Sequence, residues 1–301
     1  MAQQAKLSKI EFMQRFSTEE ACEQQLYQMK WPKGYCCEKC GCVQHSTIRT
    51  RKLPLYQCNQ CGYQASAIVN TILEKTRTPL PKWFIAIYGM ATDKRGYSAT
   101  QLARDIEVSY PTAWLILHKI REAMINRDEK YHLLGIVEMD DAYFGGPDES
   151  GKRGRGTEKT KVLIGLSLEK DGSPKFVKME VINNIKGETV AGFAGNNIAP
   201  GSTIKSDGYR SYNALNAEYQ HEPKKFNPVD DPDHLKWLHI ILSNAKAFIE
   251  GTFHGLDTKH FQRYLDEFCY RLNRRKFEGQ GFFRLLNACV SFHTITFNEL
   301  T

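Results

Sequence analysis

The stretch GIVEMDDAYFGG, residues 135–146, decides how the rest of the chain is interpreted. Residues 133–139 form an apolar run of the length expected for a strand that is buried on both faces. Two adjacent acids, Asp140 and Asp141, follow this run directly. Because ligands of open α/β sheets bind where strands end, the pattern predicts a functional site at Asp140.

A second acid ends another predicted strand further along the chain. Apolar residues alternate over 162–168 and over 176–181, on either side of a turn at Asp171 and Gly172, which predicts a β-hairpin. A helix is expected over 187–194, and a short strand over 203–206 runs into Asp207. The order β-β-β-α-β predicts a mixed-sheet α/β domain with two strand-terminal aspartates.

Two carboxylates that lie close together repel each other unless a divalent cation is bound between them. Asp140 and Asp207 could therefore share a hard metal ion if their strands are neighbours. Either aspartate could instead cap the turn or helix that follows it, which is the more common role of a single aspartate at such a position.

The last part of the chain is predicted to be helical. Over 235–249, apolar residues recur at helical spacing, and His239 and Lys246, seven residues apart, share one face. A lone helix histidine is more often a half-buried structural residue than a ligand. Both roles therefore stay open for His239.

Four of the nine cysteines form two C-x-x-C pairs, Cys37 with Cys40 and Cys58 with Cys61. The spacing, with a glycine after each pair, is typical of a four-thiolate zinc ribbon, in which the metal supplies folding free energy. Close pairs within an odd total indicate metal binding in a reducing compartment before disulfides. We therefore expect structural Zn²⁺ at these four residues.

Two helices are predicted between the cysteines and the first acid. Ser98 can cap a helix whose inner face carries Leu102 and Ile106, and a second helix is expected over 110–124 after a short turn. The pair is similar to a helix-turn-helix reader of DNA. An ordinary helical hairpin is the alternative, because the turn lacks the glycine found in many readers.

The composition is that of a globular protein. The chain has 301 residues, 41% of them hydrophobic, and a formal net charge of +7. Its length suggests one large domain with smaller attachments, and the basic surplus mildly favours a polyanionic partner. No run reaches the roughly 18 apolar residues of a membrane span, and the N-terminus is too polar for a signal peptide. A cytoplasmic protein that does not bind membranes is expected.

Five motifs, taken in order, resemble those of the ISXO-like insertion-sequence transposases. They are WPKGYCCEKCGC with YQCNQCGYQ, GYSATQLARDIEVSYPTAWLILHKIREAM, VEMDDAYFGG, KSDGYRSY and GTFHGLDTKHFQRYLDEFCYRLNRR. The resemblance covers nearly the whole chain and implies an α/β ribonuclease-H-like core of the DDE type behind a zinc ribbon and a helical DNA-binding region. The implied divisions are a helical segment at 1–30, the ribbon at 31–70, a helix-turn-helix-like region at 71–128 and the catalytic domain at 129–301.

The resemblance also implies roles for single residues. It places the first catalytic aspartate at Asp140, the second at Asp207 and a phosphate-binding lysine at Lys246. The family's usual glutamate, seven residues before that lysine, falls on His239, so the motif here is DDH. Two catalytic ions, Mg²⁺ or Mn²⁺, are expected at this site. Because imidazole is neutral and softer than carboxylate, the preference of the site should shift toward Mn²⁺ relative to Mg²⁺.

The implied activity is that of a DNA transposase, which binds terminal inverted repeats and catalyses metal-dependent phosphodiester cleavage and strand transfer. His239 in the glutamate position keeps a catalytically lapsed DNA-binding regulator open as the alternative, and a nuclease without joining activity is a third reading. The expected partner is double-stranded DNA, bound by a homodimer or higher multimer in the nucleoid of a prokaryotic cell.

The expected DNA contacts lie in a basic loop after the first acid and in the second reader helix. The loop could equally be an ordinary solvated segment. The residues are Lys152, Arg153, Arg155, Tyr110, Thr112, Lys119 and Arg121.

Overall fold

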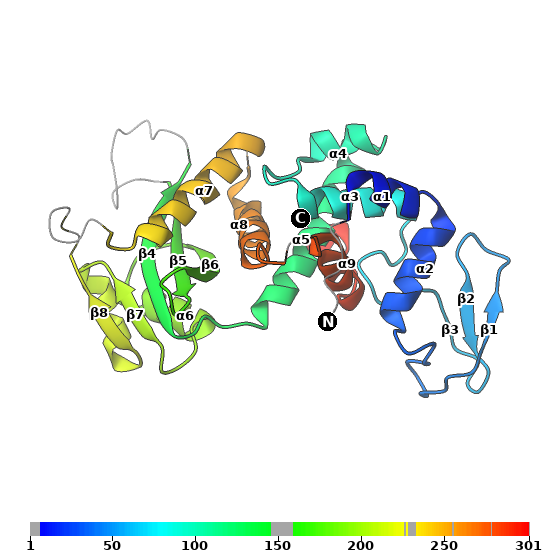
Figure 1. Ribbon diagram of the computed structural model, residues 1–301, viewed down its shortest axis with the longest axis horizontal. Coiled ribbons are helices and arrows are strands. Elements are labelled where there is room, and N and C mark those ends of the chain that lie inside the picture. The colour runs from blue at the N-terminus through cyan, green and yellow to red at the C-terminus, as the bar shows by residue number, and fades with distance from the viewer. Residues whose placement is uncertain are drawn as a thin grey trace. The chain divides into compact units, whose positions relative to one another are not determined.

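The computed structural model describes residues 7–145, 159–225, 227, 233–254, 256–277 and 279–300 (Figure 1). The chain divides into two compact units. The first unit comprises Met1–Arg127 with Phe277–Thr301, and the second comprises Asp128–Lys276. In the part of the chain that is described, every helix is too short or too polar to pass through a lipid bilayer.

The second unit is built on a five-stranded mixed sheet with the strand order β6-β5-β4-β7-β8 (Figure 1). Strands β4, β5 and β6 pair antiparallel, whereas β7 runs parallel to both β4 and β8. This confirms the predicted mixed-sheet α/β core. The strands are β4 (Ile136–Phe144), β5 (Thr160–Leu168), β6 (Pro174–Ile182), β7 (Thr203–Ser206) and β8 (Gln220–Pro223).

Helices cover both faces of this sheet. Because successive strand residues point to opposite faces, Val137 and Met139 pack on one side of β4, and Ala142 and Phe144 pack on the other. The first side is covered by α6 (Gly187–Asn197) and the 3₁₀ helix η2 (Arg210–Ala217). The second side is covered by α7 (Lys236–Thr252) and α8 (Thr258–Asn273).

Strand β4 differs from its predicted bounds. It begins at Ile136 and continues to Phe144, so Asp140 lies inside the strand and not at its exit. The reason is that β5 pairs with β4 through Phe144, whereas the parallel partner β7 ends at Ser206, opposite Met139. The predicted hairpin and the strand 203–206 are confirmed.

The first unit contains the zinc ribbon. Its three strands form a small antiparallel sheet in the order β1-β2-β3. They are β1 (His45–Ile48), β2 (Leu55–Cys58) and β3 (Gln64–Ala65). Tyr56 of β2 packs with Tyr27 and Trp31 of the preceding helix, at ring-centroid distances of 4.8 Å and 5.3 Å.

The rest of the first unit is helical, and its C-terminal helix returns to it from the end of the chain. Phe282 lies 5.2 Å from Phe12, 5.4 Å from Phe16 and 5.8 Å from Phe84, measured between ring centroids. The predicted division assigned residues up to 301 to the catalytic domain. In the structure, residues 277–301 belong to the first unit, because the apolar side of 281–291 packs on the N-terminal helices. The helices are α1 (Lys9–Arg15), α2 (Glu19–Lys30), α3 (Leu80–Thr92), α4 (Ala99–Asp105), α5 (Tyr110–Glu129), α9 (Gly281–Ser291) and α10 (Phe297–Leu300).

The predicted helix pair before the sheet is present as α4 and α5. The Ser98 hydroxyl accepts a hydrogen bond from the backbone N–H of Gln101 at 3.2 Å and caps α4, as expected. The turn that follows has no glycine, and Glu107 takes up the left-handed conformation there, with φ of 50°. The connection between α4 and α5 is therefore made through a left-handed residue that has a Cβ.

Candidate active site and zinc site

The four cysteines of the ribbon meet at one point. Their sulfur atoms all lie within 4.8 Å of one another, with Cys37 Sγ 3.6 Å from Cys61 Sγ and Cys40 Sγ 3.5 Å from Cys58 Sγ. A tetrahedral zinc site with Zn–S bonds of about 2.3 Å has sulfur–sulfur edges of about 3.8 Å. This geometry supports a structural zinc site at the four cysteines.

The backbone around the cysteines favours bound thiolate. Backbone N–H groups of Cys61 and Gln60 donate to the sulfur of Cys58 and lower the pKa of this thiol to about 6. Gly41 and Gly62, which follow the two pairs, have positive φ values of 73° and 70° that let each turn close. Cys36 and Cys42 lie outside the cluster and donate weakly to backbone carbonyls instead.

The two predicted catalytic aspartates are neighbours across the sheet. Met139 of β4 is paired with Ser206 of β7 in a parallel ladder, so Asp140 and Asp207 are the next residues of two adjacent chain segments. Adjacent strands lie about 4.8 Å apart. Tertiary structure thus brings together two acids that are far apart in the sequence.

Asp207 also takes the capping role that its position before a turn allows. Its Oδ1 accepts a hydrogen bond from the backbone N–H of Tyr209 at 3.1 Å, which is an Asx turn leading into η2. This turn fixes the carboxylate at the end of β7. A capping bond to one oxygen is compatible with a metal ligand role for the same side chain, since a carboxylate accepts several bonds.

Asp140 and Asp141 point to opposite faces of the sheet. The Asp141 carboxylate lies 3.4 Å from the hydroxyl of Tyr212, which belongs to the buried cluster under α6. By strand alternation Asp140 faces the side covered by α7. The backbone N–H of Asp141 donates to Asp140 Oδ1 at 2.8 Å and restrains this carboxylate.

Glu138 is a further member of the site that the sequence pattern did not single out. It is 8% exposed, and its Oε2 accepts a hydrogen bond from the backbone N–H of Leu238 at 3.3 Å. Helix α7 starts after Leu235, which has a φ of 52° and supplies no side-chain cap, so Glu138 takes the place of the N-cap. Burial raises the pKa of Glu138. The sequence offers one signal for this role. Glu138 and Asp140 are two residues apart in a predicted strand, so their side chains point to the same face of the sheet.

His239 and Lys246 lie on α7, the helix that passes over β4. The helix is tied to β4 at Glu138 through Leu238, and Lys246 Nζ lies 5.7 Å from the ring centroid of Phe144 at the far end of that strand. Asp140 lies between these two contacts along β4. Although His239 is largely exposed, desolvation and the neighbouring His234 lower the pKa of its imidazole, which is therefore neutral at pH 7.

The aspartates and His239 are less tightly gathered than the cysteines. Among the described residues, the cysteine cluster is the group of three or more ligand side chains whose donor atoms all lie within 4.8 Å. Asp140, Asp207 and His239 come from neighbouring strands and the overlying helix without converging to that degree. Their donor set of two carboxylates and one neutral imidazole fits a divalent cation.

The predicted DNA-contacting residues of α5 fall into two groups. Tyr110 is 55% exposed in the first turn, and half-buried Thr112 bonds Ser109 through its hydroxyl at 2.9 Å. Lys119 instead donates to Thr294 Oγ1 at 2.7 Å, and Arg121 is only 1% exposed. Helix α5 is buried on most sides beyond its first turn. Lys119 and Arg121 are therefore engaged within the protein, contrary to the prediction that they contact DNA. Lys152, Arg153 and Arg155 lie outside the described residues.

Comparison with known proteins identifies the class. Residues 132–273 match the ISXO2-like transposase domain, and residues 17–64 match the transposase zinc-ribbon domain. The chain is also 28% identical, over 169 residues, to an uncharacterized protein in transposable element ISH50 of Halobacterium salinarum. That match covers 55% of this chain and 54% of the relative, so it spans about half the length of each.

These matches lie on the two parts of the molecule described above. The five-stranded sheet with α7 and α8 coincides with the transposase domain, and all four cysteines of the cluster lie within the ribbon match. Residues 132–273 are therefore similar to an ISXO2-like transposase domain, and residues 17–64 to a transposase zinc ribbon. The domain matched over residues 132–273 is one of the DDE transposase type.

Proposed function

We propose that this protein is the DNA transposase of an insertion sequence, which binds the terminal inverted repeats, cleaves phosphodiester bonds and joins the ends to target DNA. The observation that carries the proposal is the parallel register of β4 and β7, because it sets Asp140 beside Asp207. A catalytic metal site needs carboxylates held together in this way.

In this proposal Asp140, Asp207 and His239 hold the catalytic Mg²⁺ or Mn²⁺. The two aspartates would offer carboxylate oxygens and His239 an imidazole nitrogen to these ions. Bound ions would acidify the attacking water or 3′-hydroxyl and stabilise the leaving oxygen.

The chain's own side chains contribute positioning and proton transfer. Lys246 shares a helix face with His239 and carries a compact positive charge suited to holding a phosphate. His239 is neutral at pH 7, so it can act as a metal ligand or accept a proton from the nucleophile. Glu138 keeps the first turn of α7 against β4 and so positions the backbone of His239.

DNA binding is proposed for the first turn of α5 and for the ribbon. A helix-turn-helix reader presents the N-terminal residues of its second helix to base edges, and Tyr110 and Thr112 occupy that position in α5. Lys152, Arg153 and Arg155 remain proposed phosphate contacts on sequence grounds. Since joining requires two element ends to be held together, the active form is proposed to be a homodimer or higher multimer.

The test is cleavage of a supercoiled plasmid that carries the element's ends, in the presence of Mn²⁺. Asp140→Asn and Asp207→Asn are expected to abolish both nicking and strand transfer, while both proteins still bind the ends. Asp141→Asn is the matched control, because this neighbouring carboxylate faces the opposite side of the sheet. Equal loss in all three variants would argue against the assignment.

The alternative reading is a DNA-binding regulator that has lost catalysis, and His239 in the third position is the feature that favours it. Tight binding of the ends by the unaltered protein, with no cleavage in Mn²⁺ or Mg²⁺, would support this alternative. Cleavage that gives free ends without joined products would indicate a nuclease.

A further inference from the structure

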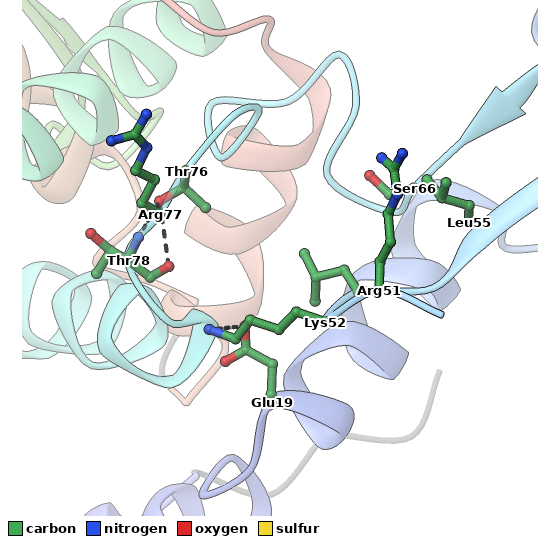
Figure 2. Close-up of a pocket in the computed structure, with 9 residues that line it drawn as sticks. Glu19, Arg51, Lys52, Leu55, Ser66, Thr76, Arg77 and Thr78 are labelled. Atoms are coloured by element: carbon green, nitrogen blue, oxygen red, sulfur yellow. Dashed lines mark hydrogen bonds and ion pairs between the residues drawn. The ribbon is translucent and has the colours of Figure 1, made fainter. Parts of the chain in front are cut away.

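A pocket of about 280 Å³ lies in the first unit, where the β1–β2 loop approaches the segment that precedes α3 (Figure 2). Figure 2 shows Arg51 on the loop side and Arg77 with Thr78 on the other side. The residues that line it are Glu19, Arg51, Lys52, Leu53, Leu55, Ser66, Thr76, Arg77 and Thr78.

The one carboxylate that lines this pocket is already engaged. Glu19 Oε2 accepts from the backbone N–H of Leu80 at 3.0 Å, at the start of α3, where Pro79 supplies no side-chain cap. Glu19 Oε1 lies 3.3 Å from Lys52 Nζ. The negative charge of Glu19 is therefore directed at a helix N-terminus and at one lysine.

The two arginines have no such compensation. Arg51 and Arg77 are both exposed, and no carboxylate in the described part of the chain forms an ion pair with either of them. A guanidinium presents five N–H donors in a planar fork that matches phosphate oxygens. The two uncompensated guanidinium groups, on opposite sides of one pocket, therefore offer separate donors to phosphate oxygens.

Both arginines are attached to backbone that is held in place. Thr76 Oγ1 accepts from the backbone N–H of Thr78 at 3.1 Å and from the indole Nε1–H of Trp83 at 2.8 Å, which fixes the segment around Arg77. On the other side, the ion pair of Lys52 with Glu19 holds the residue next to Arg51. Such pre-ordering lowers the entropic cost of binding a ligand.

We propose that this site, here called the arginine pocket (Arg51, Lys52 and Arg77), binds two neighbouring backbone phosphates of double-stranded DNA, one at Arg51 and one at Arg77. The inference rests on the proposed function, since it names a surface of the first unit that DNA would contact. A neighbouring pocket of about 490 Å³ is lined by Arg49 but also by Glu20 and Glu23, so its charges are balanced and the uncompensated positive charge belongs to the arginine pocket. No aromatic ring lines the arginine pocket, so the pocket offers no surface on which a base could stack, and the proposed contact is with phosphate.

The test compares zinc-loaded full-length protein with Arg51→Ala/Arg77→Ala in binding a short labelled duplex over a series of salt concentrations. Loss of two phosphate contacts is expected to make the slope of log Kobs against log salt shallower by about 2, and to weaken binding roughly tenfold. The control is Lys9→Ala/Lys170→Ala, which removes the same charge from exposed residues that do not line the pocket.

A further variant distinguishes a folding defect from a loss of DNA binding. Arg51→Lys/Arg77→Lys keeps both charges and is expected to retain most of the salt slope, with normal zinc content and thermal unfolding. Equal slopes and affinities for the alanine pair and the control pair would overturn the inference while the unaltered protein still binds DNA. A failure of the unaltered protein to bind any DNA would instead contradict the proposed function.

Discussion

The carboxylate of Glu138 in β4 accepts a hydrogen bond from the backbone N–H of Leu238 in the first turn of α7, at 3.3 Å. This bond joins residues on either side of the site, because Asp140 lies two positions beyond Glu138 and His239 directly follows Leu238. It serves as the helix cap that Leu235 does not provide. One buried acid therefore ties the first turn of α7 to β4, in addition to the apolar packing of the helix on the sheet.

Glu138→Ala is expected to destabilise the second unit by about 1–2 kcal/mol, because the N–H of Leu238 loses its acceptor. Glu138→Gln should stay close to the unaltered protein, since the amide oxygen can accept the same bond and burial already disfavours the charge. Urea unfolding followed by circular dichroism measures the difference. Equal destabilisation by both substitutions would show that the charge itself is needed.

The pH dependence of cleavage is expected to reflect the protonation of the His239 imidazole. Desolvation and His234 lower its pKa below the usual 6.5, so the neutral form needed for metal ligation or proton acceptance persists at pH 6.5. Activity should be fully present above that value and should be lost as the pH falls through the lowered pKa. In His239→Glu the acidic limb should move toward the carboxylate range, about pH 4–5. An acidic limb centred above 6.5, or one that does not move in the variant, would contradict this role.

Cys58→Ser is expected to remove the bound zinc and to unfold the ribbon, because three thiolates do not complete the tetrahedral site. Cys36→Ser is the control, since Cys36 is the adjacent cysteine outside the cluster. Zinc content and the near-ultraviolet signal of the Trp31 and Tyr56 rings provide the measurements. Identical zinc content in the two variants would exclude Cys58 as a ligand.

Phe282→Ala is expected to destabilise the first unit by about 3–5 kcal/mol, because this ring is 2% exposed and packs among the N-terminal helices. Phe297→Ala, at a ring that is 50% exposed, should cost far less. Thermal unfolding in parallel with DNA binding tests the assignment. If Phe282→Ala left the stability of the first unit unchanged, the C-terminal helix would not belong to that unit.

The sequence by itself determined the elements whose causes are local. The two C-x-x-C pairs predicted the zinc ligands, since short-range turns bring their sulfurs together. Alternating apolar residues predicted the hairpin β5–β6, and Ser98 marked the start of α4. The family and the mixed sheet were likewise predictable, because ordered motifs and element order are properties of the chain alone.

Tertiary structure decided the features that depend on partners far away in the sequence. The position of Asp140 inside β4 follows from the length of β5, and its place beside Asp207 follows from the register with β7. Arg121 is buried, and Lys119 donates to Thr294 and to the carbonyl of Ile72, because α5 packs against segments that are distant in the sequence. Helical periodicity gives the relative directions of side chains on one helix, whereas the surfaces that cover that helix are set by long-range packing.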